Sequence, residues 1–134
     1  SLAPSPYDLF MNGPEIFNFT LRVVPDLVDS VLDSAGLQFS DIDLFVPHQA
    51  NAFMLKHLRD KLGISEERFA VDMEDFGNTV SSTIPMTLAR LAKKGQLFEG
   101  MKIMVLGFGV GLSWAGAVLT WAVPARISGV GSTP

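Results

Sequence analysis

The sequence contains no cysteine among its 134 residues. Disulfides and thiolate metal sites are therefore excluded, and so is a cysteine nucleophile supplied by this chain. The absence also favours an intracellular, cytoplasmic setting. The longest apolar runs, Ile103–Val110 and Ala115–Val123, contain glycine or polar residues and are too short to span a membrane. The formal net charge is −4 and there is no basic stripe, which argues against nucleic acid as a partner. We therefore expect a soluble globular protein.

The amino end, Ser1 to Pro6, has neither an initiator methionine nor the apolar region of a signal peptide. We therefore expect the chain to be part of something larger. Its length suits one domain with its own core, which we place at residues 1–122, with an irregular start at Ser1–Tyr7. Residues 123–134 are rich in small residues and proline, and are predicted to form a flexible tail.

The spacing of apolar residues predicts an α/β fold. Helical spacing extends from Ile16 to Gly36, where Pro25 should kink or split the helix, and returns from Ala50 to Gly63 and from Ser81 or Ser82 to Gly95. Continuous apolar runs predict strands at 42–46, 102–108 and 113–121, the second and third of which should pair. A further brief strand is predicted at 69–71. This order indicates a β-sheet covered by α-helices.

His48 and Asn78 are the first candidate functional residues. His48 follows the apolar run that Pro47 ends, just before a predicted helix, where α/β sheets gather functional groups. A lone histidine is equally compatible with a structural role. Asn78, in the polar loop 75–79, holds the matching position before the next helix. Adjacent loops at one sheet edge would bring an imidazole and a carboxamide together, and two neutral donors aimed at one point can stabilise an enolate.

The glycine-rich bend Gly107–Gly111 allows two interpretations. A dinucleotide fingerprint is not one of them, because the spacing is Gly-x-Gly-x-Gly and a strand follows. The bend is either a tight turn between buried strands or a set of unhindered backbone donors that face a reacting oxygen. Ser113 lies in a pattern similar to a nucleophile elbow, but the elbow requires a strand-to-helix turn.

Charged and metal-ligating residues give weaker signals. His48 and His57 are nine residues apart with no suitable third ligand nearby, so no metal site is predicted. His57 is expected on a solvated helix face. Lys56 and Arg59 are neighbours on that helix, and either remain solvated or meet an acidic partner.

Three motifs together resemble the β-ketoacyl-acyl carrier protein synthase III family, condensing enzymes of the thiolase-like fold. The motifs, in the family's order and spacing, are Val46–Asn51, Gly77–Thr79 with Ser81–Pro85, and Gly107–Gly111 with Trp114 and Gly116. The resemblance covers about residues 11–121. It implies the C-terminal half of such an enzyme, with a mixed β-sheet covered by α-helices.

The resemblance also implies a Cys-His-Asn site in which His48 and Asn78 hold the malonyl thioester carbonyl during decarboxylation. It assigns one oxyanion N–H to Val110 and a contact with the pantetheine arm of the substrate to Asn51. The cysteine belongs to the family's N-terminal half, so this chain alone should be inactive. The implied substrates are acyl-CoA and malonyl-acyl carrier protein, without metal or cofactor. The implied partners are acyl carrier protein, the missing N-terminal half and a second copy in a homodimer.

Two residues depart from the family pattern. Val110 stands where the family often has glycine, which keeps the backbone donor but restricts its conformation. Phe53 stands where well-known members carry an arginine that helps to dock the carrier protein, and Lys56 and Arg59 are predicted to compensate. The resemblance thus implies an acyltransferase of fatty acid biosynthesis. The alternatives are a related ketosynthase of secondary metabolism and a non-catalytic homologue that acts as an interaction domain.

Overall fold

The computed structural model of the protein describes residues 11–123. Its elements, in order, are α1 (Gly13–Ala35), β1 (Leu44–Pro47), α2 (Ala52–Leu62), α3 (Thr83–Lys93), β2 (Lys102–Gly109) and β3 (Ser113–Thr120), with short 3-10 helices at Phe39–Asp41, Glu66–Arg68 and Val80–Ser82. The predicted irregular start and, apart from Val123, the predicted tail lie outside the described residues. The α/β class is confirmed.

The three strands form one mixed sheet in the order β1-β2-β3. β1 runs parallel to β2, with Leu44 opposite Ile103, and β2 runs antiparallel to β3. The predicted pairing of the last two strands is confirmed. The predicted strand at 69–71 is wrong: only a single bridge joins Phe69 to Phe45. The Ala70 N–H donates to the Phe45 carbonyl, but the next donor of a parallel ladder would be Pro47, which has no N–H. The Ala70 carbonyl accepts a hydrogen bond of 3.2 Å from the Gln49 side chain instead.

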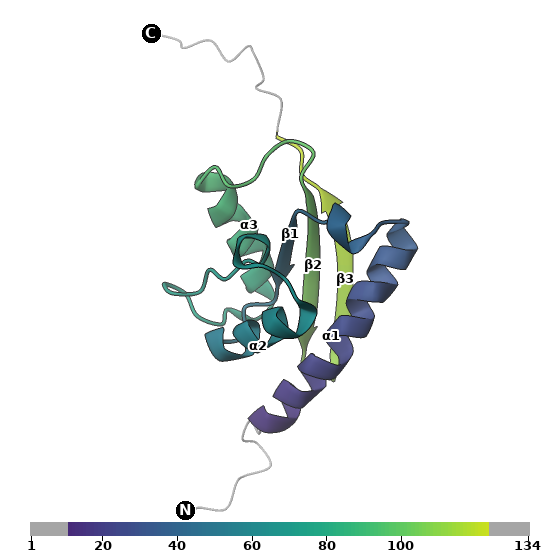
Figure 1. The fold of residues 1–134 in the computed structure, drawn as a ribbon. Coiled ribbons are helices and arrows are strands. Elements are labelled where there is room, and N and C mark those ends of the chain that lie inside the picture. The colour runs from purple at the N-terminus through teal and green to yellow at the C-terminus, as the bar shows by residue number, and fades with distance from the viewer. Residues whose placement is uncertain (1–10, 124–134) are drawn as a thin grey trace, which may run out of the picture.

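Helices cover both faces of the sheet (Figure 1). On one face α1 and α2 close over Phe45, Met104 and Leu106, and on the other α3 packs against Leu44, Val46 and Ile103. Successive strand residues point to opposite faces, so β1 and β2 contribute to both cores. The carboxyl end of β1 and the bend after β2 therefore lie at one edge of the sheet, where the parallel pair ends.

The long helix α1 is held by local signals at its ends and by packing between them. Asn12 caps its first turn by accepting a hydrogen bond from the Glu15 N–H, and Gly36 ends it with φ at +65°. Pro25 was predicted to kink or split the helix, but α1 runs through it without a break. Val24 and Val28, on either side of Pro25, are both buried against the sheet. Their burial offsets the backbone hydrogen bond that proline removes.

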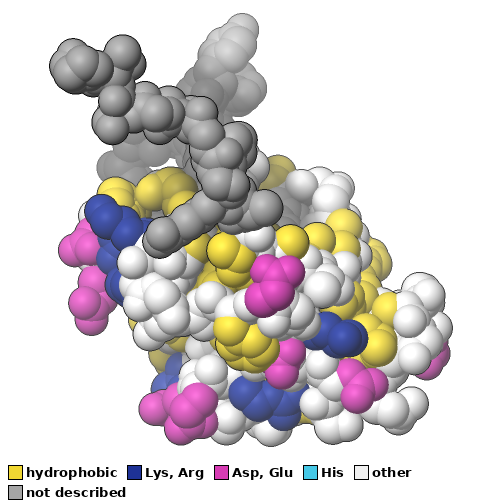
Figure 2. All heavy atoms as spheres, turned by 90° about the horizontal axis from the view of Figure 1, so that it is seen from above, with side chains coloured by type: hydrophobic (Ala, Val, Ile, Leu, Met, Phe, Trp, Pro, Cys, Tyr) yellow, Lys and Arg dark blue, Asp and Glu magenta, His cyan; other side chains and the backbone are white. Residues whose placement is uncertain are grey.

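The outer face of the molecule retains apolar surface. The residues predicted to be buried on α3, Met86, Leu88, Leu91 and Ala92, are only half-buried, whereas Thr83 and Thr87 are fully buried. Exposed large apolar side chains include Phe53, Val110 and Trp114. Hydrophobic side chains also reach the surface between charged ones on the face seen in Figure 2. Among residues 11–123, no helix has the length and apolar character needed to cross a membrane.

Candidate active site

His48 lies where β1 ends, and its backbone and ring are both fixed. Its N–H donates to the Leu106 carbonyl at 2.7 Å, which extends the parallel pairing by one residue beyond Pro47. Nδ1 of the ring lies 2.7 Å from the Thr83 hydroxyl, and Phe108 packs edge-on against the ring with centroids 5.5 Å apart. Burial lowers the pKa of His48 below its ordinary value, because the half-buried imidazolium would lose solvating water. The geometry therefore favours a neutral, oriented imidazole.

Asn78 is exposed, and its carboxamide is oriented by its own loop. Its side-chain oxygen accepts a hydrogen bond of 2.9 Å from the Val80 N–H. Because an N–H requires an acceptor, this contact assigns the oxygen to the loop and leaves the amide NH₂ as the outward donor. Val80 itself has φ at +57°, in the left-handed region. That conformation costs a residue with a Cβ about 1–2 kcal/mol, and such strain is common at functional sites.

Thr83 connects the two loops. Its hydroxyl contacts the His48 ring at 2.7 Å, its backbone N–H donates to the Val80 carbonyl, and the Val80 N–H donates to Asn78. A chain of hydrogen bonds thus joins the two candidate residues, although their side chains do not bond to each other within residues 11–123. The arrangement brings an imidazole and a carboxamide to neighbouring loops at one sheet edge.

The bend between β2 and β3 lies beside His48. Phe108, which packs against His48, is two residues before Val110, and Val110 is 81% exposed in the turn that leads into β3. Among the described residues, the Val110 N–H makes no backbone hydrogen bond outside the strand ladder. Because β3 begins at Ser113, the turn is strand to strand, which is neither a nucleophile elbow nor a dinucleotide fold.

Asn51 has a structural contact of its own. Its side-chain oxygen accepts a hydrogen bond of 2.8 Å from the Met54 N–H and so caps α2. The residue is exposed, so its amide NH₂ group is left facing solvent. The pantetheine contact remains a prediction, with this NH₂ group as its available donor.

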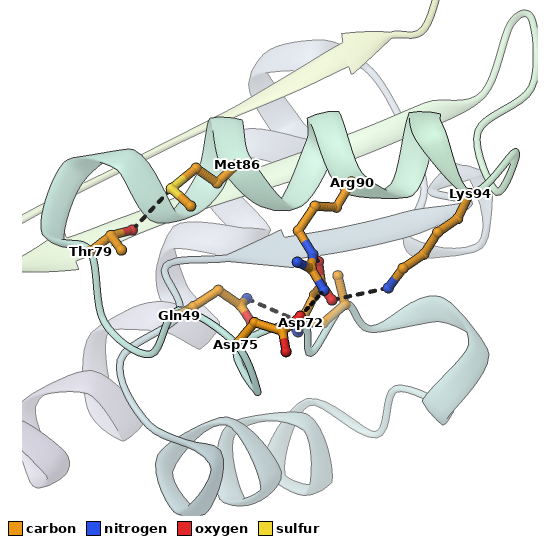
Figure 3. A network of polar contacts seen from close by, with 8 residues as sticks. Gln49, Asp72, Asp75, Thr79, Met86, Arg90 and Lys94 are labelled. Atoms are coloured by element: carbon orange, nitrogen blue, oxygen red, sulfur yellow. Dashed lines mark hydrogen bonds and ion pairs between the residues drawn. The ribbon is translucent and has the colours of Figure 1, made fainter.

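Gln49 is the site residue that the sequence analysis missed. It is 1% exposed, and its NH₂ group donates to the carbonyls of Pro47 and Ala70 at 2.8 and 3.2 Å. Its side-chain oxygen accepts from the Asp72 N–H at 2.9 Å (Figure 3). The buried carboxamide therefore ties the His48 segment to the segment that leads to Asn78. No periodic pattern marks it, since it lies in the irregular stretch between β1 and α2.

Charged residues fasten the loop before Asn78 to α3. Arg90 binds Asp72 and Asp75 at 2.5 and 2.8 Å, and Lys94 binds Asp72 at 3.1 Å (Figure 3). Arg90 also lies over the Phe76 ring. Burial raises the pKa of Asp72, but the hydrogen bonds and charges of Arg90 and Lys94 together outweigh it and hold that pKa below its ordinary value. These ion pairs were not predicted, because their partners lie in different elements.

The cations proposed for carrier-protein docking are already paired. Lys56 binds Asp60 at 2.7 Å, and Arg59 binds Glu66 at 2.6 Å. Lys56, Arg59 and Phe69 line a shallow hollow of about 420 Å³. Docking through Lys56 and Arg59 is untested and remains a prediction.

His57 was expected on a solvated face, and that expectation is wrong. Its ring is half-buried and packs against Phe17 of α1 and Phe53, with centroids 5.5 and 4.2 Å away. No group of three or more histidine, aspartate and glutamate side chains in residues 11–123 is arranged to hold a metal ion.

Comparison with known proteins decides the family. Residues 32–121 match the family model described as 3-oxoacyl-[acyl-carrier-protein (ACP)] synthase III C terminal. The chain belongs to this family. The β-ketoacyl-[acyl-carrier-protein] synthase III of Clostridium acetobutylicum is 43% identical over 111 residues, which cover 83% of this chain and 34% of that protein.

Solved structures of the synthase III family share the thiolase-like fold of this chain. A crystal structure of 3-oxoacyl-(acyl-carrier-protein) synthase III superimposes with a TM-score of 0.82 at 50% identity, over 84% of this chain and 33% of that one. The priming β-ketosynthase of the R1128 polyketide pathway gives a TM-score of 0.78 at 37% identity, over 87% and 35%. The chain thus spans about a third of the length of the relatives it matches.

Proposed function

We propose that this chain is the C-terminal part of a β-ketoacyl-acyl carrier protein synthase, an acyltransferase of fatty acid biosynthesis, and supplies the decarboxylation half of its active site. The observation that carries the proposal is the hydrogen-bonded chain from the His48 ring to the Thr83 hydroxyl, from the Thr83 N–H to the Val80 carbonyl, and from the Val80 N–H to Asn78. It holds two neutral donors at one sheet edge, and the glycine-rich bend that carries the exposed residue Val110 packs against His48 through Phe108. Family membership and the match to synthase structures support the same assignment.

In the proposed reaction, His48 Nε2–H and the Asn78 NH₂ group donate to the thioester carbonyl oxygen of malonyl-acyl carrier protein. As the carboxylate leaves as carbon dioxide, its bonding electrons form an enolate whose oxygen these donors stabilise. The enolate carbon then attacks an acyl thioester, and the Val110 N–H donates to the oxyanion that forms. The cysteine thiolate that held the acyl group departs. Neutral donors suffice for each step, so the proposal includes no metal or cofactor.

The acyl thioester must be held outside these residues, because the chain contains no cysteine. We assign the nucleophile to an N-terminal region such as the one that the relatives possess, loaded from acyl-CoA. Without that region the chain is expected to be inactive. In the complete enzyme we propose a homodimer that binds acyl carrier protein. Residues 1–122 are proposed as the folded unit and Asn51 as a contact for the pantetheine arm.

The substitution His48→Ala in the full-length enzyme tests the division of labour. Self-acylation by radiolabelled acyl-CoA should remain largely intact, while carbon dioxide release from malonyl-acyl carrier protein should stop. His57→Ala, which removes the other histidine, serves as the matched control and should retain decarboxylation. Equal loss of acylation and decarboxylation in His48→Ala would contradict the proposal.

A ketosynthase of secondary metabolism is the second candidate. The similarity to the R1128 priming ketosynthase favours it, and so does Phe53 at the position where the family's docking arginine is expected. Both candidates use the same site and differ in their acyl and carrier substrates. Measuring condensation with carrier proteins of the two classes separates them: preference for the fatty acid carrier supports the first and preference for a polyketide carrier supports the second. A non-catalytic interaction domain would bind a carrier protein without condensing any substrate.

A further inference from the structure

Thr83 is the buried residue in direct contact with the candidate catalytic histidine. It is the first residue of α3 and is 3% exposed. Its hydroxyl oxygen has three polar neighbours: Nδ1 of His48 at 2.7 Å, the Gln49 N–H at 3.2 Å and the Val80 carbonyl oxygen at 3.2 Å. A hydroxyl carries one proton and accepts up to two hydrogen bonds. How Thr83 distributes them determines where His48 carries its own proton.

The three neighbours differ in whether they require the proton of the Thr83 hydroxyl. The Gln49 N–H can only donate, so it uses one lone pair of the Thr83 oxygen. The Val80 carbonyl already accepts a hydrogen bond from the Thr83 N–H, so it does not depend on the hydroxyl. The remaining neighbour, Nδ1 of His48, is also the nearest. A separation of 2.7 Å is typical of a hydroxyl donor and short for an N–H donor, whose commonest distance is about 2.9–3.0 Å.

We propose that Thr83 is a positioning residue whose hydroxyl donates to Nδ1 and holds neutral His48 in the tautomer with its proton on Nε2. The hydrogen bond made by one ring nitrogen selects the tautomer of the other. The opposite tautomer would present a lone pair, instead of an N–H, at Nε2. The consequence for catalysis rests on the function proposed above, because only an Nε2–H can donate to the enolate oxygen. The assignment of the tautomer rests on the contacts of Thr83 and does not require the proposed function.

Nuclear magnetic resonance tests the tautomer directly. Long-range ¹H–¹⁵N correlations on the ¹⁵N-labelled chain, at a pH where His48 is neutral, distinguish a protonated from an unprotonated ring nitrogen. The wild type should show His48 with its proton on Nε2. Thr83→Val keeps the shape and removes the hydroxyl, and should lower the ratio of the Nε2–H to the Nδ1–H form about fivefold, as expected for losing one hydrogen bond. Thr83→Ser should restore the wild-type ratio.

Thr87→Val is the matched control. Thr87 is buried on the same helix, at 1% exposure, one turn beyond Thr83. Its substitution removes a buried hydroxyl at a position one turn from the His48 contact, and should leave the tautomer ratio unchanged. A wild type with the proton on Nδ1 would overturn the proposal without any variant, as would an unchanged ratio in folded Thr83→Val. If that variant does not fold, the wild-type spectrum and that of Thr83→Ser still show which ring nitrogen of His48 carries the proton.

A kinetic measurement in the full-length enzyme connects the tautomer to the reaction. Thr83→Val should reduce kcat for malonyl decarboxylation by the factor by which the fraction of His48 with its proton on Nε2 falls, while KM changes little, and Thr83→Ser should recover it. If His48→Ala abolishes decarboxylation but Thr83→Val leaves kcat unchanged although that fraction has fallen, the role of Thr83 is refuted and the proposed function stands. If His48→Ala retains decarboxylation while the tautomer shifts in Thr83→Val, the proposed function fails and the positioning contact stands.

Discussion

Replacing Gln49 by methionine should destabilise the protein far more than an ordinary glutamine substitution does. Methionine has a similar length and shape, so the change removes hydrogen bonds without leaving a large cavity. Three bonds are lost: two donated to the Pro47 and Ala70 carbonyls and one accepted from the Asp72 N–H. Both carbonyls belong to buried residues, so water does not readily replace the lost donor.

The size of the effect follows from those three groups. A buried polar group left without its partner costs roughly 1–3 kcal/mol, and the group at Asp72 is less enclosed than the two carbonyls. We therefore expect Gln49→Met to lower the free energy of unfolding by about 3–6 kcal/mol. Since a domain of this size is stable by only about 5–15 kcal/mol, the variant should unfold at much lower urea concentration or lose its cooperative transition.

Urea denaturation followed by circular dichroism measures this difference. Gln96→Met is the control, because Gln96 is exposed and the same chemical change there should stay within about 0.5 kcal/mol of the wild type. Hydrogen exchange adds a local readout, since the Asp72 amide loses its acceptor and should exchange faster. A Gln49→Met protein within about 1 kcal/mol of the wild type would refute the claim that the three bonds hold the two loops together.

Three other predictions concern charge and packing. Asp72→Asn should cost about 1–3 kcal/mol at pH 7, measured by urea denaturation, because the ion pairs with Arg90 and Lys94 are lost. The folded pKa of Asp72 lies below the unfolded value of about 3.9, so this contribution to stability is complete above pH 4–5 and disappears as the pH falls through the folded pKa. The stabilities of the wild type and the variant should therefore converge in acid, and a difference that stays constant with pH would contradict the prediction. Gly116→Ala should lower thermal stability by about 1–3 kcal/mol, since its Cβ would lie 3.0 Å from the Val31 side chain, and an unchanged melting temperature would contradict this contact. Reversing Lys56 and Arg59 to glutamate in the full-length enzyme should weaken carrier-protein binding measured by calorimetry, and unchanged affinity would exclude docking there.

Much of the fold could be predicted because its signals are local. Helix ends are marked by residues that act within one turn: Asn12 caps α1, while Gly36 and Gly63 adopt the left-handed conformation that stops α1 and α2. The effect of Pro25 on α1 could not be predicted from such local signals. Whether a proline splits a helix depends on what the two halves pack against, and here a continuous sheet surface supports both.

The side-chain environment was predictable only where the partners are near in sequence. Lys56 and Asp60 lie one turn apart on α2, which is the spacing of a common helix ion pair. His57 was placed wrongly because Phe17, which covers it, comes from α1, forty residues earlier. The same limit explains why the sequence analysis gave Thr83 no role of its own. Its partner His48 is 35 residues away.

The proposed site uses neutral donors, and the surrounding contacts are consistent with that choice. In a decarboxylation the malonyl carboxylate is charged before reaction and the enolate oxygen is charged after it. A cation beside the substrate would also bind the malonyl carboxylate. It would then stabilise the substrate before decarboxylation as well as the transition state, and so would not lower the barrier between them. A neutral N–H gains strength mainly as charge develops on the thioester oxygen.

Two features keep charge away from the proposed donors. Burial lowers the pKa of His48 and so favours the uncharged ring, and Thr83 occupies its second nitrogen. The nearby cation Arg90 is neutralised by Asp72 and Asp75 (Figure 3). The ion pairs therefore serve to hold the loop that carries the carboxamide, while the groups that would touch substrate remain uncharged. In this arrangement charged residues stabilise the loop, while neutral, oriented dipoles are left to carry out the proposed chemistry at the same edge of the sheet.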